Sequence, residues 1–219
     1  MQEGPVVNLL WATPNAEEII VRCARVSVPP GKEKRPGIKL LRYLMKHKHW
    51  SPFEMASFCV EIWTTRDISR QILRHRSFHY QEFSQRYATV TEIQNVAITR
   101  QARLQDTANR QNSLETDNES IQQRWDALQK QVWDTCKSAY LEALDLHIAK
   151  EQARAVLPEG MTLSHLFMSG TIRDFIHYVN VRTDETAQKE HRRVAELIRD
   201  ILLDIIPSLR EPVPGEKVQ

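Results

Sequence analysis

A run of regularly spaced apolar residues in the second half of the chain constrains the fold more than any other sequence feature. Within residues 121–144, apolar side chains recur at spacings of three or four. The positions are Ile121, Trp125, Leu128, Val132, Cys136, Tyr140 and Leu144. Spacing of this kind places side chains on one face of an α-helix. The pattern therefore predicts a long amphipathic helix.

Shorter patterns predict further helices and a few strands around it. Helical spacing recurs in 15–27, 38–45, 67–75, 149–160, 171–182 and 185–207. Thr171 and Asp174 form a T-x-x-D sequence, which is typical of a helix N-terminus. Residues 58–63 alternate in polarity as a strand does, and 162–170 suggest a second strand.

We therefore expect an α+β fold, namely a single helix-rich domain with a small mixed or antiparallel sheet over residues 1–219. A chain of 219 residues is long enough to form one domain with a full hydrophobic core. No internal repeat or clear linker divides it. Residues 88–118 are polar and contain neither glycine nor proline, so we interpret them as a long excursion over the surface with short helical pieces.

Composition and charge limit the functions open to the chain. The net charge of +2 argues against a broadly basic surface that grips duplex DNA by its phosphates. The three cysteines are odd in number and lack C-x-x-C spacing, which favours a reducing compartment. Neither a secretory signal nor an apolar run of about 20 residues, the length that spans a bilayer, is evident. We therefore expect a cytoplasmic protein without a membrane segment.

Arginines are concentrated in the middle of the chain. Nine arginines and no lysine lie between Lys48 and Lys130. Solvated surfaces usually mix the two cations, whereas the planar fork of arginine matches the oxygens of phosphate and carboxylate groups. For residues 70–86, which include the stretch RHRSFHYQEFSQR (74–86), we therefore favour a binding site over composition bias.

Local geometry within this stretch supports a site for a phosphorylated ligand. If residues 67–75 are helical, Gln71 and Arg74 share one face. If the chain is extended from Glu82 onward, Glu82, Ser84 and Arg86 point in the same direction. A carboxylate, a hydroxyl and a guanidinium would then form a row beside a helix end.

Other kinds of site fit the same residues less well. His47 and His49 lie two apart, but no zinc-type pattern is present and the nearby arginines repel a cation, so we expect no metal. Ser84 lacks the G-x-S-x-G elbow of a serine nucleophile, so we interpret it as a hydrogen-bonding group that positions a ligand. The six glycines form no G-x-G-x-x-G or P-loop motif, so side chains such as Arg154 and Arg182 would have to hold nucleotide phosphates.

Two alternative functions remain open at this point. Phe78, Tyr80, Phe83 and Tyr87 could stack the bases of a single-stranded nucleic acid beside the arginines. The interleaved Glu82 and the small net charge count against that reading. The other alternative is a metal-dependent phosphohydrolase, whose activity would be lost on chelation.

The pattern RHR-x7-S over residues 74–84 resembles the signature of the flavin-dependent thymidylate synthases. Other segments resemble the same family in the same order along the chain. They are ARVS (24–27), LMKHKHWSPFE (44–54), SRQILRHR (69–76), ARAVLP (153–158) and the R-x8-R run from Arg173 to Arg182. The resemblance implies a homotetramer of α+β subunits with FAD sites between the subunits. It also implies methylation of dUMP to dTMP, with 5,10-methylenetetrahydrofolate as carbon donor and NADPH as the reductant of the flavin.

The resemblance further implies roles for individual residues. The implied flavin contacts are His49, Ser51, Arg74, His75, Arg76, Ser77, Glu82, Thr171, Arg173 and His177. The implied dUMP contacts are Gln71, Arg74, Glu82, Phe83, Ser84, Gln85, Arg86, Arg154 and Arg182. Arg182 is similar to the arginine that activates the uracil, and a fixed guanidinium there would stabilise negative charge on the ring. With Ser84 it makes up the expected catalytic pair. Family members often carry leucine in place of Phe83 and asparagine in place of His177.

Overall fold

A four-stranded antiparallel sheet forms the centre of the molecule. The computed structural model describes residues 4–29, 31–32 and 36–210. The strands follow one another in the order β1-β2-β6-β3, and every neighbouring pair is antiparallel. Their bounds are β1 Val6–Ala12, β2 Ser57–Thr65, β6 Leu163–Thr171 and β3 His79–Glu82. The expected α+β class with a small sheet is therefore confirmed.

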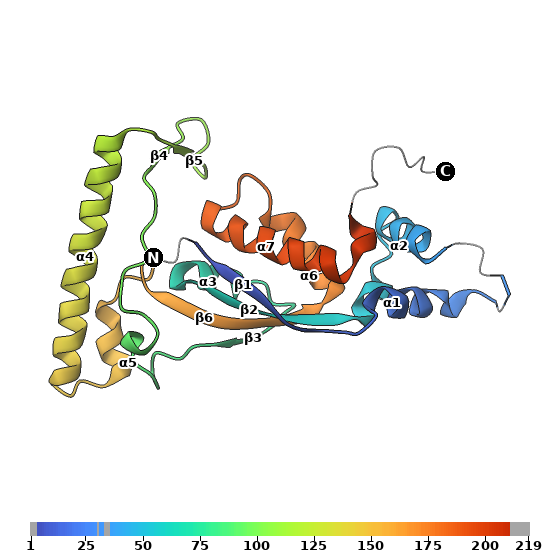
Figure 1. The fold of residues 1–219 in the computed structure, drawn as a ribbon, viewed down its shortest axis with the longest axis horizontal. Coiled ribbons are helices and arrows are strands. Elements are labelled where there is room, and N and C mark those ends of the chain that lie inside the picture. Colours follow the sequence, from blue (N-terminus) through green and yellow to red (C-terminus); the bar gives the residue numbers. More distant parts are fainter. Residues whose placement is uncertain (1–3, 30, 33–35, 211–219) are drawn as a thin grey trace.

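Helices surround the sheet on one face and at both ends (Figure 1). The α-helices are α1 Ala16–Ala24, α2 Gly37–Lys46, α3 Arg66–Ile72, α4 Glu119–Asp145, α5 Lys150–Ala153, α6 Ile172–Arg182 and α7 Lys189–Ile205. Short 3-10 helices are η1 Arg25–Ser27, η2 Ser51–Met55, η3 Val90–Glu92, η4 Arg154–Val156 and η5 Pro207–Leu209. Figure 1 shows α6 and α7 over one face of the sheet, α4 across one end, and α1 and α2 at the other end. Within the described residues, no helix combines the length and the apolar character needed to span a membrane.

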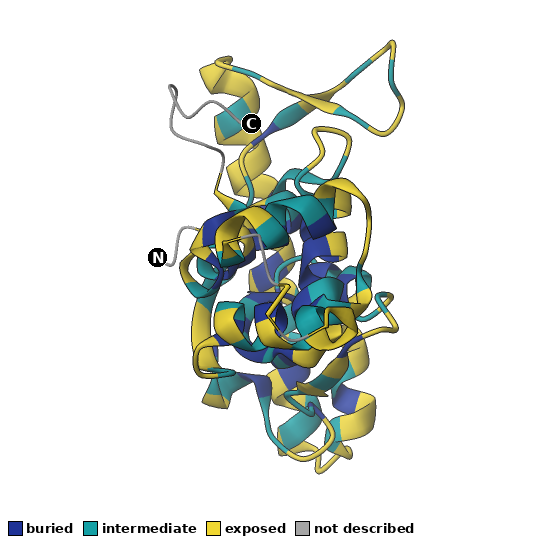
Figure 2. Ribbon diagram, turned by 90° about the vertical axis from the view of Figure 1, so that its right-hand side faces the viewer, coloured by how far each residue is buried: buried dark blue, intermediate teal, exposed yellow. Residues whose placement is uncertain are grey.

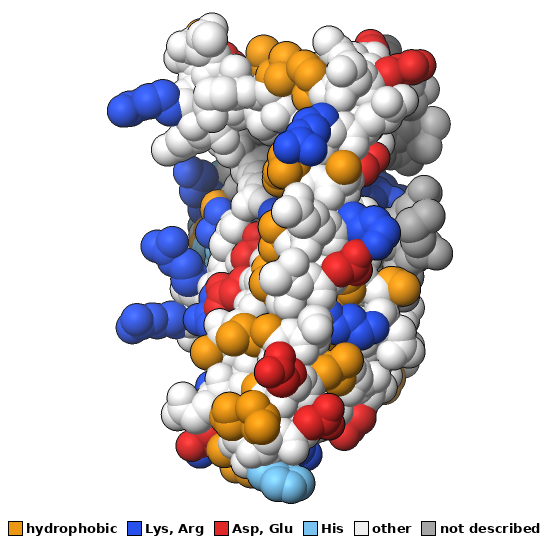
Figure 3. Space-filling view, turned by 90° about the vertical axis from the view of Figure 1, so that its left-hand side faces the viewer, with side chains coloured by type: hydrophobic (Ala, Val, Ile, Leu, Met, Phe, Trp, Pro, Cys, Tyr) orange, Lys and Arg blue, Asp and Glu red, His pale blue; other side chains and the backbone are white. Residues whose placement is uncertain are grey.

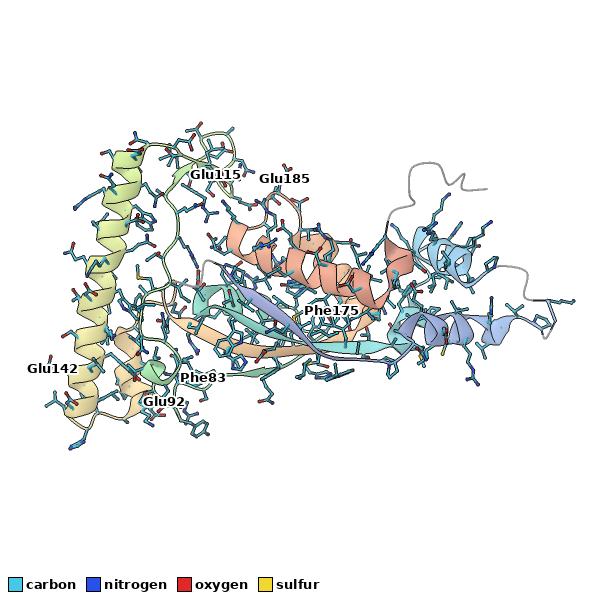
Figure 4. The ribbon with its side chains drawn as sticks, viewed as in Figure 1. Phe83, Glu92, Glu115, Glu142, Phe175 and Glu185 are labelled. Atoms are coloured by element: carbon cyan, nitrogen blue, oxygen red, sulfur yellow. The ribbon has the colours of Figure 1, made fainter. Side chains whose placement is uncertain are left out.

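The core lies between the sheet and the helices α6 and α7. Val60, Ile62 and Leu166 point into it from neighbouring strands and are completely buried. The ring of Phe175 in α6 stacks on the ring of Phe58 in β2, with centroids 3.6 Å apart (Figure 4). The alternation predicted for residues 58–63 is confirmed, because burial of side chains on one face drives the pairing of these strands.

The junction from β6 into α6 fixes where the helix begins. The Asp174 carboxylate accepts a hydrogen bond from the Thr171 backbone N–H at 3.0 Å, and the Thr171 hydroxyl accepts one from the Asp174 N–H at 3.3 Å. This reciprocal capping box confirms the helix start predicted from the T-x-x-D sequence. The residue before Thr171 is Gly170. A Cβ atom at this position would lie 2.5 Å from the Phe78 ring, so only glycine fits there.

The polar excursion is more ordered than its sequence suggests. It contains η3 and a hairpin of β4 (Arg103–Gln105) and β5 (Ser113–Glu115). Its turn is held by the Asp106 carboxylate, which accepts hydrogen bonds from the backbone N–H groups of Ala108 and Asn109. Figure 2 shows the buried residues in dark blue at the centre of the molecule and the hairpin standing out from it. The short helical piece was predicted, whereas the hairpin was not.

Candidate active site

The arginine-rich stretch begins on α3 and continues through a turn. The helix ends at Ile72, three residues earlier than the spacing predicts. The backbone N–H of Arg74 then donates to the carbonyl oxygen of Gln71 at 3.3 Å, and that of His75 donates to Ile72 at 3.0 Å. Gln71 is half-buried and Arg74 is exposed to solvent, and the helix on which the two were expected to share a face does not reach Arg74.

The row of Glu82, Ser84 and Arg86 expected on an extended segment is not formed. The strand β3 ends at Glu82, and the Ser84 carbonyl then accepts hydrogen bonds from the N–H groups of Tyr87 and Ala88, both at 3.1 Å. This turn buries Gln85, whose side chain is 3% exposed, and sends Arg86 outward to an ion pair with Glu151 at 3.2 Å. The extended prediction was wrong because local turn hydrogen bonds override strand pairing here.

Arg182 and His75 come together although 107 residues separate them. The Arg182 guanidinium donates from Nε to His75 Nε2 at 2.9 Å. Burial first, and then the charges of Arg182 and Arg74, lower the pKa of His75 to about 4. His75 is therefore neutral near pH 7, and its Nε2 can accept this hydrogen bond. The bond fixes Arg182 at the C-terminal end of α6.

A cavity of about 320 Å³ lies beside α3. Its walls are formed by Arg66, Arg70, Gln85, Glu151, Arg154, Ala155, Leu157, Glu159 and Thr162. Two of its polar atoms, Arg66 Nη1 and Gln85 Nε2, are buried without a hydrogen-bond partner among the described residues. Arg66 Nη1 lies 3.7 Å from Glu82 Oε1, which is an ion pair but too long for a hydrogen bond. The cavity therefore offers positive charge to an anion, and two unpaired donors lie buried in its walls.

Glu82, Phe83 and Ser84 lie between the strands and this cavity. Glu82 Oε1 accepts hydrogen bonds from the hydroxyls of Ser69 and Ser164, both at 2.6 Å. The Phe83 backbone N–H donates to the His165 carbonyl at 2.8 Å, and Figure 4 shows Phe83 on the α5 side of the molecule.

The Ser84 hydroxyl has no activating base in the structure. Its oxygen lies 3.4 Å from the Arg86 N–H, and among the described residues no histidine or carboxylate is hydrogen-bonded to it. A serine nucleophile needs such a base. The geometry therefore favours a positioning role for Ser84.

Most of the expected flavin contacts lie in three segments, namely residues 49–51, the turn after α3, and α6 with its first capping residue, whereas Glu82 lies on β3. His177 packs its ring edge-on against Trp50, with centroids 4.8 Å apart, and Arg173 forms an ion pair with Glu54. These contacts hold the segment that contains His49 and Ser51 against α6. Arg74, Arg76 and Ser77 are exposed, and the Thr171 hydroxyl serves the capping box.

Neither alternative function finds support in this geometry. Phe78 is buried in the core, and the Tyr80 hydroxyl donates to the carbonyls of Ile72 and His75. Only Tyr87 is freely exposed, so the aromatic rings do not form a stacking platform for nucleic-acid bases. Within the part of the chain that the structure describes, no three His, Cys, Asp or Glu side chains are placed to hold a metal ion.

The structure adds Arg66 and His191 to the residues expected at the site, and it places Arg70, from the favoured stretch 70–86, on the cavity wall. Arg66 and Arg70 lie one helical turn apart on α3 and both line the cavity. Their spacing of four is a detectable signal, because it places both on the same face. His191 gives no such signal, because the sequence shows it only as a polar residue of an amphipathic helix. In the structure it is fully buried beside Gln71.

The fold and the cavity together define a class of α+β protein. In this class, arginine side chains are available to hold an anionic ligand in place of a glycine-rich loop. The family model described as thymidylate synthase complementing protein matches residues 8–208. A probable flavin-dependent thymidylate synthase from Paramecium bursaria Chlorella virus 1 is 46% identical over 195 residues, covering 89% of this chain and 88% of the relative. The flavin-dependent thymidylate synthase of Synechocystis sp. is 45% identical, covering 88% and 87%. The chain belongs to the family of flavin-dependent thymidylate synthases.

Solved structures share the fold. The UMP/dUMP methylase PolB from Streptomyces cacaoi, bound with 5-Br UMP, superimposes with a TM-score of 0.81 at 24% identity, covering 94% of this chain and 92% of that one. The same methylase bound with 5-Br dUMP gives a TM-score of 0.81 at 25% identity, covering 94% and 93%. The family resemblance and the fold are thus confirmed together.

Proposed function

We propose that this chain converts dUMP to dTMP by reductive methylation with the help of bound FAD. One observation carries the proposal: the unpaired donors Arg66 Nη1 and Gln85 Nε2 share one arginine-lined cavity. An unpaired buried donor costs about 1–3 kcal/mol, which a bound acceptor recovers. A nucleotide phosphate is such an acceptor, and the relatives are flavin-dependent thymidylate synthases.

Arginines of the cavity would hold the phosphate of dUMP. Arg70 forms an ion pair with Glu159 at 2.5 Å, and Arg154 donates from Nε to the carbonyl of Glu151 at 3.3 Å. A dianionic phosphate competes for these arginines, because guanidinium groups bind phosphate in a bidentate manner. Glu151 and Glu159 would thus balance the positive charge in the free protein.

Arg182 would act on the uracil ring. Its Nε is held by His75, whereas its terminal nitrogens form no hydrogen bond with a described residue. A guanidinium fixed in this way can stabilise the negative charge that makes uracil C5 nucleophilic. The three cysteines are free, and Cys59 is buried in β2 with its pKa raised by burial, which fits a reaction that needs no attacking thiolate.

The donor set near α6 fits FAD. Arg74 and Arg76 are exposed, and neither forms a side-chain hydrogen bond or ion pair with a described residue. Free guanidinium groups suit the two phosphates of FAD, and His49, Ser51, Ser77 and His177 add neutral hydrogen-bonding groups. When bound, FAD would supply the hydride of the reaction. The role of the chain is to bind, orient and polarise.

We further propose that four copies of the chain assemble, with each site shared between copies. The apolar residues Ile121, Trp125, Leu128 and Val132 of α4 are 38%, 39%, 36% and 44% exposed. Figure 3 shows hydrophobic side chains along the face of the molecule that α4 forms. A continuous apolar stripe of this kind is typical of an interface. Arg182 is not among the residues that line the cavity with Gln85 and Arg154, which supports a site completed by a second copy.

NADPH and 5,10-methylenetetrahydrofolate complete the proposed reaction. Family membership supports both co-substrates, since reductive methylation needs a carbon donor and a source of electrons. The free cysteines support a reducing compartment and therefore the cytoplasm.

The proposal is tested with purified protein and one arginine variant. The protein should take up FAD and form dTMP from dUMP when both co-substrates are present. Arg182→Ala should lower dTMP formation by roughly 10²–10³ while FAD stays bound, because a preorganised cation is lost from the charged transition state. Arg193→Ala is the matched control, since Arg193 is exposed on α7 and, among the described residues, forms an ion pair only with nearby Glu196. Wild-type protein that neither binds FAD nor oxidises NADPH would overturn the proposal.

A further inference from the structure

A chain of hydrogen bonds crosses the interior between α6, α7 and α3, with His191 at its centre. His191 is fully buried on α7. Its Nε2 lies 3.0 Å from the Tyr178 hydroxyl, and its Nδ1 lies 3.3 Å from Gln71 Oε1. Gln71 Nε2 donates to Gln188 Oε1 at 2.7 Å. Both ring nitrogens of His191 therefore form hydrogen bonds, although His191 is not among the contacts that the family resemblance implies.

Glu190, at the end of this series of hydrogen bonds, fixes the donor and the acceptor in each bond. Glu190 Oε1 accepts from Arg103 at 2.6 Å, and its Oε2 accepts from Gln188 Nε2 at 3.0 Å. Burial raises the pKa of Glu190, but hydrogen bonds from its own backbone, Arg103 and Gln188 outweigh burial and lower it, so the carboxylate only accepts. Gln188 must then turn its amide nitrogen toward Glu190 and its oxygen toward Gln71. Gln71 in turn must present its oxygen to His191.

His191 completes this directional order. Burial first, and then the charges of Arg182 and His75, lower its pKa to about 3, so the ring is neutral near pH 7. A neutral ring has one donor and one acceptor nitrogen. Because Gln71 presents an oxygen, Nδ1 carries the proton and Nε2 accepts from Tyr178, whose pKa burial raises.

We infer that His191 is a positioning residue, which together with Gln188 holds the Gln71 amide so that Gln71 offers an N–H donor and not its carbonyl to the nucleotide. This inference rests on the proposed function, in which Gln71 contacts dUMP. One Gln71 N–H is used by Gln188, and the second remains for the ligand. The nucleotide offers acceptors, namely phosphate and uracil carbonyl oxygens, so a flipped amide would set an oxygen against an oxygen.

Two substitutions separate the two ring nitrogens of His191. The side-chain nitrogen of asparagine is attached at the same carbon as Nδ1, so His191→Asn can still donate to Gln71 but cannot reach Tyr178. The end of a glutamine side chain lies near Nε2, so His191→Gln can still accept from Tyr178 but leaves Gln71 without its donor. A role in packing alone would make the two variants equivalent, because each loses one hydrogen bond in the same buried place.

The experiment measures dUMP binding by calorimetry, KM for dUMP, kcat and FAD content for both variants and the wild type. His191→Gln should raise Kd and KM for dUMP about three- to tenfold, the loss expected for one hydrogen bond, with kcat changed less than about twofold. His191→Asn should stay within about twofold in Kd and KM. In a Gln71→Ala background, His191→Gln should have no further effect on KM, because the residue that it orients is absent.

The outcomes distinguish this inference from the function on which it rests. FAD-loaded wild type that does not bind dUMP overturns the proposed function and the inference with it. Wild type that binds dUMP overturns the inference alone if the Asn and Gln variants have equal KM values, or if the effect of His191→Gln persists without Gln71.

Discussion

Two amphipathic helices of this molecule, α7 and α4, differ in how far their apolar faces are buried. On α7, Val194, Ala195 and Ile198 are completely buried against α6 and the sheet. On α4, apolar residues at the same kind of spacing, such as Leu128 and Val132, are more than a third exposed. The difference teaches that periodicity predicts an apolar face but does not tell whether the same chain covers it.

The contacts that α4 makes within the chain overlap its apolar stripe, because Trp125 Nε1 donates to the Arg100 carbonyl at 2.8 Å. Gln129 Nε2 donates to the Arg100 carbonyl at 2.9 Å, and the Tyr140 hydroxyl accepts from the Val90 N–H at 3.2 Å. These two residues and Trp133 are the buried ones on α4. The excursion therefore holds α4 by polar contacts at and beside the stripe, while Ile121, Leu128 and Val132 stay more than a third exposed.

Truncation in the α7 face should have the largest effect on stability. Ile198→Ala removes three carbon atoms from a closed core and should lower the free energy of unfolding by about 2–5 kcal/mol, measured by denaturant titration. Val132→Ala on the α4 stripe is the matched control. At protein concentrations where the chain is monomeric, it should cost less than about 1 kcal/mol, because that side chain is already exposed. Equal losses would show that α4 is packed within one chain.

A charge on the α4 stripe should break assembly more than folding. Leu128→Glu places a carboxylate in the proposed interface and should weaken association at least about 100-fold, or about 2.7 kcal/mol. Sedimentation velocity measures the assembly, and circular dichroism checks that helix content is kept. Gln123→Glu adds the same charge on the side of α4 away from the stripe, so it should leave assembly intact. Dissociation by both variants would contradict an interface at the stripe.

Elements with a strong local pattern are the ones the sequence predicts. The helices α4 and α6 and the strand β2 each carry a repeating apolar spacing, and Thr171 and Asp174 mark the start of α6. The strand β1 gives no alternating pattern, because Leu9 and Leu10 at the edge of the sheet are both exposed. An edge strand is not forced to alternate, so its sequence does not reveal it.

The site was predictable in its parts but not in its arrangement. The arginine-rich stretch and the motif resemblance point to Gln85, Arg154 and Arg182. The turn at Ser84 follows from backbone hydrogen bonds that no side-chain pattern encodes. The placement of His191 beside Gln71 depends on how α7 packs against α3, a tertiary contact between residues 120 apart in sequence.

Acid should weaken the α7 side of the molecule through His191. Folded His191 has a pKa of about 3, whereas an unfolded histidine titrates near 6.5. Below pH 6.5 the unfolded state binds more protons, so the free energy of unfolding falls with pH, by about 2 kcal/mol between pH 6.5 and pH 5. His191→Asn lacks this contribution. The difference in the free energy of unfolding between wild type and His191→Asn should therefore shrink by that amount as the pH falls from 6.5 to 5.

Urea titrations at several pH values measure this effect. His75 titrates in both proteins, so its contribution cancels in the difference. The bounds of α4 contain no histidine, so Val132→Ala should follow the wild-type pH dependence. Parallel curves for wild type and His191→Asn would show that His191 is not held neutral.

The smallest effect is expected for the ion pair between Lys130 and Asp134 on α4. Both side chains are exposed, on a side of the helix away from the stripe. A double-mutant cycle should give a coupling of about 0.3–0.5 kcal/mol at low salt, because water screens an exposed i, i+4 pair. In about 1 M salt, where the Debye length is about 3 Å, the coupling should approach zero. A coupling above about 1 kcal/mol that resists salt would mean that this side of α4, exposed in the single chain, is covered in the assembly. The interface would then surround the helix and would not be limited to the apolar stripe.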